Sequence, residues 1–466
     1  MRKNLNVVLI VMDAVRADHL SCYGYNKPTT PFLEELAGNG VLFEGAFASA
    51  PWTPPSHASL FTGTYPSRHG VDVNENLYLG EENTTLAQIL ATTGYRTFAI
   101  LPDAHLSSAR GFHRGFHDYI EVFRLPHFKL DFGIIETSAR NLLLGRDKRS
   151  SLINKLVKRW LTDNAVRDIP FFAFINYKTA HNRYQSPWPF RRRFEITPAA
   201  TQDKKKLDYF SEAGGYSYMA GKFEMSEEDF EVVRSRYDGA IACIDHRIRD
   251  LVRFLKAKNL YDDTLIMITA DHGENFGEHR LAYHLFCLYD SLIRVPLIFH
   301  APAIFRGPVR LPHLVSLTDI LPTLMDLLNL DPVTRQDLEG KSLLPLNGHA
   351  YHTHVFSEFA RPTWMLRNLA ARFPGNDFSH LDRGLKCIRT SEYKLIVGTD
   401  GGEELYHLPS DPTESHNLID ERIEVAKVLR TKYQDWVAAH QGSRSSSPYQ
   451  EEDALILKNL KELGYV

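Results

Sequence analysis

The fold and the candidate site are interpreted around one stretch of the sequence, Trp52-Thr53-Pro54-Pro55-Ser56-His57-Ala58-Ser59-Leu60-Phe61-Thr62-Gly63. Thr53 precedes a Pro-Pro step, and Ser56 to Phe61 is typical of a short helix. Proline suits a first helical turn, because its missing N–H would be unbonded there. Thr53 is therefore predicted at a helix N-terminus, where free N–H groups and the dipole favour an anion. An alcohol beside an anion site is what nucleophilic attack on a phosphate or sulfate ester needs. The alternative is that Thr53 only caps the helix.

A buried strand is predicted upstream of this stretch, at Asn6 to Met12. Its continuous β-branched character is typical of a parallel strand covered on both faces. The strand ends in Asp13, and ligands of open α/β sheets gather at the carboxyl ends of strands. Asp13 is thus a candidate metal ligand, with a helix N-cap as the alternative. Met1-Arg2-Lys3 and the apolar run resemble a signal peptide, but the run is short and lacks a cleavage site.

Downstream, strands alternate with helices, which predicts an α/β fold with a large, mostly parallel, doubly wound sheet flanked by helices. The predicted strands include Val41 to Phe47, Thr97 to Leu101, Phe171 to Ile175 and Thr264 to Thr269, and the longest predicted helix is Glu227 to Ala257. The ends of these strands bring further polar residues to the same rim, namely Asp103, His105, His181, Asp271 and His272.

Two parts are predicted, an α/β domain over residues 1–345 and a small α+β subdomain over 346–466. The second part is indicated by short strands and a final helix, at Val355 to Phe359, Gly384 to Arg389, Tyr393 to Val397 and Glu421 to Ala439. Gln441 to Tyr449, rich in serine, is predicted to be a linker. An insertion at about 121–226 is predicted to supply a lid or substrate-contacting loops.

Basic and apolar residues mix at helical spacing between Leu142 and Leu161. A solvated helix packed on the domain explains this pattern, and a surface for an anionic partner is the alternative.

The composition is that of a soluble globular protein: 466 residues, 43% hydrophobic, 24% charged and a net charge of −3. Such a charge gives no global attraction to nucleic acid or to an anionic membrane. No apolar stretch approaches the roughly 20 residues needed to span a bilayer. Four widely separated cysteines favour free thiols in a reducing compartment, with two disulfides as the alternative. We therefore expect a cytoplasmic protein without a transmembrane segment.

Asp13, Thr53, Asp271 and His272 form a candidate metal site. Carboxylates with one imidazole suit a divalent cation such as Mn²⁺, Zn²⁺ or Mg²⁺, and Ca²⁺ less well. A metal on the Thr53 hydroxyl would lower its pKa, as it does for bound water.

These residues carry a resemblance to the sulfatase family, within the alkaline phosphatase superfamily, over nearly the whole chain. The matching segments are Asn6 to Gly24, Thr53 to Gly63, Tyr65 to Gly70, Thr269 to Glu274, Tyr289 to Ile298, Thr318 to Thr323 and Leu405 to Leu418. The resemblance implies an α/β domain that holds the metal site and a smaller C-terminal four-stranded domain.

The resemblance also implies roles for single residues. Thr53 falls where sulfatases carry the cysteine or serine that becomes formylglycine, and Asp13, Asp271 and His272 fall on metal-ligand positions. His57 falls where an arginine steadies the nucleophile. Three more histidines correspond to positions that face the substrate in the family. His181 matches a substrate-facing histidine, His105 matches the histidine of a lysine–tryptophan–histidine segment, and His284 lies near the position of a sulfate-binding lysine.

Four departures from the family pattern bear on the chemistry. Threonine cannot become formylglycine, His57 replaces an arginine, Ala14 stands where a second metal-binding aspartate is usual, and Asp103 replaces a lysine. A sulfated threonine cannot release sulfate by converting to an aldehyde, as a sulfated formylglycine hydrate does. A phosphorylated threonine can be hydrolysed, because water or another acceptor can attack its phosphorus. The residues thus favour a metal-dependent hydrolase of a phosphate mono- or diester, or a phosphotransferase, acting through Thr53.

Two other functions stay open at this stage. One is a true sulfatase with an unmodified Thr53, and the other is a non-catalytic protein that binds an anion or a partner. In the enzymatic cases His181, His105 or His284 is the candidate general acid, since imidazole titrates near neutral pH. The expected substrate is a small-molecule, glycan-derived or lipid-derived phosphate or sulfate ester.

Overall fold

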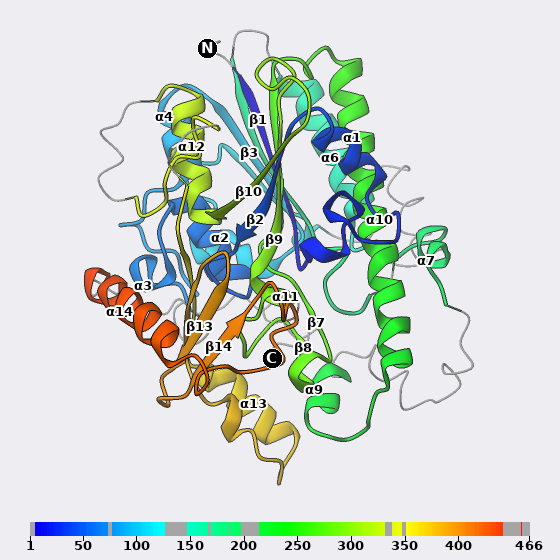
Figure 1. The fold of residues 1–466 in the computed structure, drawn as a ribbon. Helices are drawn as coiled ribbons and strands as arrows, with labels where there is room; N and C mark the ends of the chain where they lie inside the picture. The colour runs from blue at the N-terminus through cyan, green and yellow to red at the C-terminus, as the bar shows by residue number, and fades with distance from the viewer. Residues whose placement is uncertain are drawn as a thin grey trace.

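A computed structural model gives the fold of the chain (Figure 1). It describes residues 5–72, 77–125, 147–165, 169–184, 186–196, 214–330, 338–346 and 351–440, and Lys458. The predicted linker at Gln441 to Tyr449 lies outside the described residues, as does the part of the basic stretch before residue 147.

A large sheet of eight strands forms the centre of the molecule, in the order β10-β2-β9-β6-β1-β5-β3-β4. Strand β9 runs antiparallel to β2 and β6, and all other neighbours are parallel. The strands are β1 (Asn6–Met12), β2 (Val41–Phe47), β3 (Arg96–Leu101), β4 (Asp118–Glu121), β5 (Phe171–Tyr177), β6 (Thr264–Thr269), β9 (Arg294–His300) and β10 (Val309–Ser316). The predicted mostly parallel α/β sheet is confirmed.

Helices cover both faces of this sheet (Figure 1). One face carries α1 (Pro31–Ala37), α6 (Ser150–Asn164) and α10 (Glu227–Ala257), and the other carries α2 (Thr53–Thr62), α4 (Leu86–Thr92) and α12 (Ile320–Leu327). Shorter helices are α3 (Pro66–His69), α7 (Phe190–Arg193), α9 (Gly214–Met219) and α11 (Asp290–Ile293). A two-stranded ribbon, β7 (Asn275–Phe276) with β8 (Ala282–Tyr283), follows β6.

Local sequence explains where the main elements begin. Every residue of β1 is buried, as expected for the innermost position between β5 and β6. Ser226 starts α10 with a capping box, because its hydroxyl accepts from the N–H of Asp229 and the Asp229 carboxylate accepts from the N–H of Ser226. The same arrangement of Thr85 and Gln88 starts α4.

A second sheet of four antiparallel strands forms the C-terminal part, in the order β11-β12-β13-β14. Its elements are β11 (Val355–Phe359), α13 (Thr363–Arg372), β12 (Leu385–Arg389), β13 (Tyr393–Gly398), β14 (Glu403–His407) and α14 (Ile423–Ala439). The first strand adjoins the α/β domain, because the N–H of Glu358 donates to the Ser49 carbonyl at 2.8 Å. The predicted antiparallel sheet is confirmed, whereas the division at residue 345 stays a prediction.

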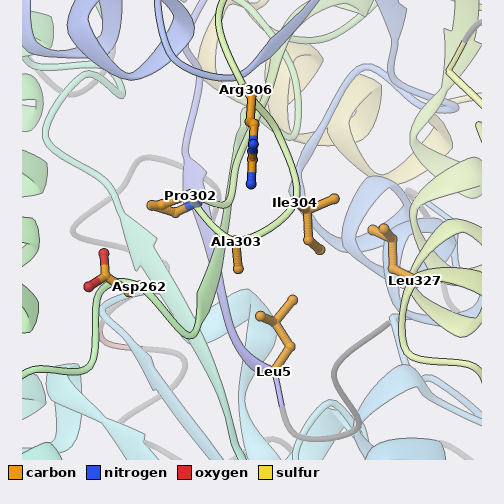
Figure 2. A pocket seen from close by; sticks show the side chains of 7 residues that line it. All are labelled: Leu5, Asp262, Pro302, Ala303, Ile304, Arg306 and Leu327. Carbon is orange, nitrogen blue, oxygen red and sulfur yellow. The ribbon is translucent and has the colours of Figure 1, made fainter.

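A cavity of about 430 Å³ lies at the amino ends of the parallel strands (Figure 2). It is lined by Leu5, Asp262, Pro302, Ala303, Ile304, Arg306 and Leu327. Leu5 and Asp262 precede β1 and β6, so this cavity is at the opposite end of the sheet from Asp13 and Asp271. Its lining includes neither a hydroxyl or thiol nucleophile nor a set of metal ligands, whereas Thr53, Asp13 and Asp271 lie at the other end of the sheet.

Candidate active site

Four charged residues form a row along the carboxyl edge of the large sheet. The pairing of Met12 with Tyr177 and of Val11 with Thr269 places Asp13 level with both Lys178 and Asp271. The pairing of Ile100 with Ile175 places Asp103 level with Lys178 in the same way. Strand order and register therefore produce the row Asp271, Asp13, Lys178, Asp103.

Helix α2 brings Thr53 to this row. Thr53 is the first residue of the helix, followed by Pro54 and Pro55, and its side chain is 1% exposed. Trp52 occupies the N-cap position, so the alternative that Thr53 merely caps the helix is wrong. The Thr53 hydroxyl lies 3.2 Å from Nε2 of His272. The hydroxyl thus faces the metal-type residues from a helix N-terminus.

Asp13, Asp271 and His272 form a group that fits a divalent cation. One potential ligand atom of each lies within 4.8 Å of the others, and all three are fully buried. Both oxygens of Asp13 and Oδ2 of Asp271 have no hydrogen-bond partner. Burial, and then the charge of Asp271, raise the pKa of Asp13 well above its usual range. Buried carboxylate oxygens without partners are costly unless a cation compensates them.

The remaining atoms of this group are held in an orientation that suits metal binding. His272 donates from Nδ1 to the Gly273 carbonyl at 2.8 Å, which leaves Nε2 as the lone-pair nitrogen facing Thr53 and Asp13. Oδ1 of Asp271 accepts from the N–H groups of Ala14 (3.2 Å) and His272 (3.0 Å). Burial lowers the pKa of His272, which keeps its imidazole neutral.

The turn after Asp13 is unusual. Ala14 has a φ of +59°, in the left-handed region that non-glycine residues rarely adopt. The Tyr237 hydroxyl of α10 holds the turn, donating to the Ala14 carbonyl (2.7 Å) and accepting from the Arg16 N–H (2.8 Å). The helix cap suggested for Asp13 is wrong, because Asp13 makes no such bond.

His57 lies one helical turn after Thr53 in α2. Its Nδ1 donates to the Thr53 carbonyl at 2.9 Å and lies 3.5 Å from Oδ2 of Asp271. Burial lowers the pKa of His57, so the ring is neutral and its charge does not replace that of an arginine. His57 therefore holds the first helical turn.

Two more histidines face the metal-type group. The His284 ring stacks on His272 with centroids 4.4 Å apart, and His181 approaches His284 at 4.7 Å. Nδ1 of His284 is hydrogen-bonded to Oε1 of Glu274 at 3.0 Å. Burial holds the pKa of both His181 and His284 well below the usual value. They are neutral groups next to the site, suited to proton transfer.

His105 lies on the other side of the row, bonded to Oδ1 of Asp103 through Nδ1 at 3.2 Å. Burial lowers the pKa of His105 to about 4. Burial opposes ionisation of Asp103, but Lys178 and then His105 hold the pKa of that carboxyl well below its usual range. The Trp52 ring packs edge-on to His105, 5.7 Å away.

Lys178 is the residue that the sequence analysis missed. Its Nζ forms an ion pair with Asp103 and lies 3.9 Å from Oδ2 of Asp13. Burial opposes its charge, but Asp103 and Asp13 raise the pKa of Lys178. A buried cation therefore lies between Asp103 and Asp13, directly after the strand β5 that pairs with both β3 and β1. Its position directly after a buried strand was the available signal.

Lys148 was assigned to a solvated helix, but it precedes α6 and is directed inward. Its Nζ donates to the carbonyls of His181 (2.6 Å) and Asn182 (2.5 Å). Burial lowers the pKa of Lys148 to about 7. Lys155 and Arg159, within α6, are exposed as predicted.

Comparison with known proteins identifies the family. A family model described as Sulfatase matches residues 5–330, and one described as N-sulphoglucosamine sulphohydrolase, C-terminal, matches residues 277–438. The chain therefore belongs to the sulfatase family and is a hydrolase of esters.

Several characterised proteins are similar over nearly their full length. Human arylsulfatase K is 25% identical, with 97% of this chain and 86% of that protein covered. The Delta 4,5-hexuronate-2-O-sulfatase of Bacteroides thetaiotaomicron is 23% identical, with 89% and 84% covered. The crystal structure of the phosphonate monoester hydrolase of Agrobacterium radiobacter has a TM-score of 0.74 at 24% identity, with 94% and 96% covered. The structural likeness establishes the fold.

No helix in the described part of the chain is both long and apolar enough to cross a membrane. The four cysteines, all buried, form no disulfide. The expected cytoplasmic location stays a prediction.

Proposed function

We propose that this protein hydrolyses a phosphate mono- or diester through a phosphorylated Thr53. The observation that carries the proposal is the Thr53 hydroxyl at the start of α2, 3.2 Å from Nε2 of His272 and beside the unpartnered oxygens of Asp13. This arrangement provides a nucleophile, a site for a cation and a helix N-terminus for an anion.

Asp13, Thr53, Asp271 and His272 would hold the divalent cation, with Mn²⁺, Zn²⁺ or Mg²⁺ best matched to their oxygen and nitrogen donors. Such a cation supplies Lewis-acid activation of the Thr53 hydroxyl and offsets charge on a substrate oxygen.

The chain's own residues divide the reaction into two displacements. The Thr53 oxygen attacks phosphorus and gives its proton to a neutral histidine of the site, while the bond to the leaving group breaks and the leaving oxygen takes up that proton. Water then attacks the phosphothreonine at phosphorus, which restores the Thr53 hydroxyl and releases phosphate from a monoester substrate or a phosphate monoester from a diester substrate. Lys178, close to Asp13, supplies positive charge near the reacting anion.

His284 is the preferred general acid among the three candidate histidines. Its ring lies against His272 and its Nδ1 is fixed by Glu274, which orients the imidazole beside the residues that would bind the cation. It acts as a general acid once it has taken up the proton that Thr53 releases. His181 is the second candidate, since it lies next to His284. His105 is bonded to Asp103 on the far side of the row and is better suited to orienting substrate.

A threonine nucleophile favours phosphorus over sulfur. A formylglycine hydrate releases sulfate by collapsing to the aldehyde, and threonine lacks the second hydroxyl that this requires. A phosphothreonine needs no such route, because water can attack phosphorus. The likeness to the phosphonate monoester hydrolase is consistent with action on phosphorus esters.

Sulfate ester hydrolysis is the second candidate function. It is favoured by the likeness to arylsulfatase K and to the Delta 4,5-hexuronate-2-O-sulfatase, whose names specify sulfate esters. In that case the substrate would be a sulfated glycan fragment. A non-catalytic role is disfavoured, because the Thr53 hydroxyl lies 3.2 Å from Nε2 of His272 and one ligand atom each of Asp13, Asp271 and His272 lies within 4.8 Å of the others.

One experiment separates these functions. The purified protein is loaded with Mn²⁺, Zn²⁺ or Mg²⁺ and given matched nitrophenyl esters: phosphate monoester, phosphate diester, phosphonate monoester and sulfate. We expect turnover of a phosphorus ester and its loss in Thr53→Ala. Acid quenching during turnover of a radiolabelled phosphate ester should trap label on the peptide that contains Thr53. Turnover of the sulfate alone would overturn the proposal.

A further inference from the structure

The segment from Trp188 to Ile196 carries a surface patch that the proposed chemistry does not use. We call Trp188, Arg191, Arg192, Arg193 and Ile196 the arginine patch. Trp188 is 57% exposed and Ile196 is 41% exposed, and the three arginines between them are exposed. Large apolar side chains at the surface are informative when they gather with charges of one sign.

Helix α7 holds this patch in a fixed position on the outside of α10 (Figure 1). The close approach depends on Gly239 of α10, where a Cβ would lie 2.7 Å from the Phe190 carbonyl oxygen. The Phe190 ring also packs on His246 of α10, with centroids 5.4 Å apart. Helix α7, which carries the three arginines of the patch, is therefore packed firmly against α10.

Within the described part of the chain, the ion pair of the patch is with one carboxylate, that of Glu195. Nε of Arg192 lies 3.8 Å from Glu195, and Arg193 lies over the Phe194 ring at 5.4 Å. Arg191 has no ion pair within the described residues. Burial, and then the charge of Arg191, lower the pKa of the neighbouring Arg236 to about 10.

We propose that the arginine patch docks the protein on an anionic phospholipid surface. Arginine side chains would pair with lipid phosphates, while Trp188 and Ile196 would enter the interfacial region, where tryptophan is favoured. An anionic polysaccharide would use the arginines but gain little from Ile196, so the combination favours a membrane. The proposal stands independently of the ester that Thr53 attacks.

The test is co-sedimentation of the full chain with lipid vesicles. We expect binding to vesicles of equal parts phosphatidylglycerol and phosphatidylcholine and none to pure phosphatidylcholine. The triple variant Arg191→Glu, Arg192→Glu, Arg193→Glu should weaken binding by about tenfold or more, given the contribution of each basic residue. The double variant Trp188→Ser, Ile196→Ser should weaken it severalfold at unchanged charge.

Matched controls change the same properties elsewhere. The variant Arg280→Glu, Arg310→Glu, Arg361→Glu alters three exposed arginines outside the patch, and Ile423→Ser removes a 64% exposed apolar side chain. Both controls should bind like the unaltered protein, and soluble-ester turnover should be the same in all variants. Failure of the unaltered protein to bind anionic vesicles would overturn the proposal. Equal loss in the controls, or retention on heparin beads without vesicle binding, would also overturn it.

Discussion

Two buried clusters of charge in this protein are built in opposite ways. At the junction of the two sheets, Nζ of Lys394 lies 2.5 Å from Asp290, 2.7 Å from Glu414 and 3.1 Å from the Leu288 carbonyl. Asp290 also forms an ion pair with Arg389, with 3.1 Å between Oδ2 of Asp290 and Nη2 of Arg389. At the candidate active site, Asp13 has two oxygens without a hydrogen-bond partner, and its nearest cation is 3.9 Å away.

The junction cluster contains its own counter-charges, as expected of charge that stabilises the fold. The Asp13 group lacks them, as expected of residues that bind a cation. Buried ions are stable only when partners replace the lost water, and the junction cluster supplies those partners from within the chain. The Asp13 group lacks them, so the chain alone leaves its desolvation cost unbalanced. A cation from outside would supply the missing partner, and this explains why the cost is tolerated. The two clusters should therefore respond differently to substitution.

The largest expected effect is on turnover in Thr53→Ala. Loss of the nucleophile should lower kcat by at least about 10⁴-fold while leaving the fold and the metal content nearly unchanged. Steady-state kinetics measure kcat, and elemental analysis of the purified variant measures its metal content. Thr62→Ala, at the other end of α2, is the matched control and should remain active. Activity within tenfold of the unaltered protein in Thr53→Ala would contradict the assignment.

At the junction cluster, Lys394→Met should lower the free energy of unfolding by about 3–5 kcal/mol, because it leaves Asp290 and Glu414 buried with too little positive charge. Urea denaturation followed by circular dichroism measures this. Lys427→Met removes an exposed lysine and should have little effect. Turnover per folded molecule should stay the same in Lys394→Met, and a selective loss of turnover would show that the cluster has a catalytic role.

At the site, Lys178→Met should lower kcat/KM by roughly 10²-fold, since it removes the positive charge near the reacting anion. The variant also leaves Asp103 unpaired and should lose stability. Adding Asp103→Asn should restore stability without restoring turnover, because the two roles of Lys178 are separate. If the double variant recovered both stability and turnover, the role of Lys178 would be structural only.

The smallest effect should appear in Asp13→Asn under chelating conditions. Burial raises the pKa of Asp13 above its unfolded value, so ionisation of this carboxyl opposes folding as pH rises from about 4 through the raised value. Metal-free Asp13→Asn should thus gain about 1 kcal/mol over the unaltered protein near pH 8, and the gain should vanish near pH 4.

Urea midpoints across that pH range measure the difference. With metal present the order should reverse, because Asp13→Asn loses a ligand that stabilises the folded state. Equal stability of the two proteins under both conditions would contradict a metal role for Asp13.

Much of the architecture could be read from the sequence, because buried parallel strands leave continuous apolar runs. Strands β1, β2 and β6 lie where their runs predict them. The edge strands β4 and β10 and the last strand β14 were missed, since partly exposed strands lack such a run. Lys178 was missed for a different reason, because the sequence does not reveal which strands are neighbours.

The sequence by itself determined the chemical types: a hydroxyl before a Pro-Pro step, acids directly after buried strands and a surplus of histidines. The tertiary structure decided their arrangement. The order β6-β1-β5-β3 and the registers between these strands place Asp271, Asp13, Lys178 and Asp103 in one row, far apart as they are in the chain. Strand pairing is set by long-range packing and hydrogen bonding, so no local pattern could have shown that Lys178 lies between Asp13 and Asp103.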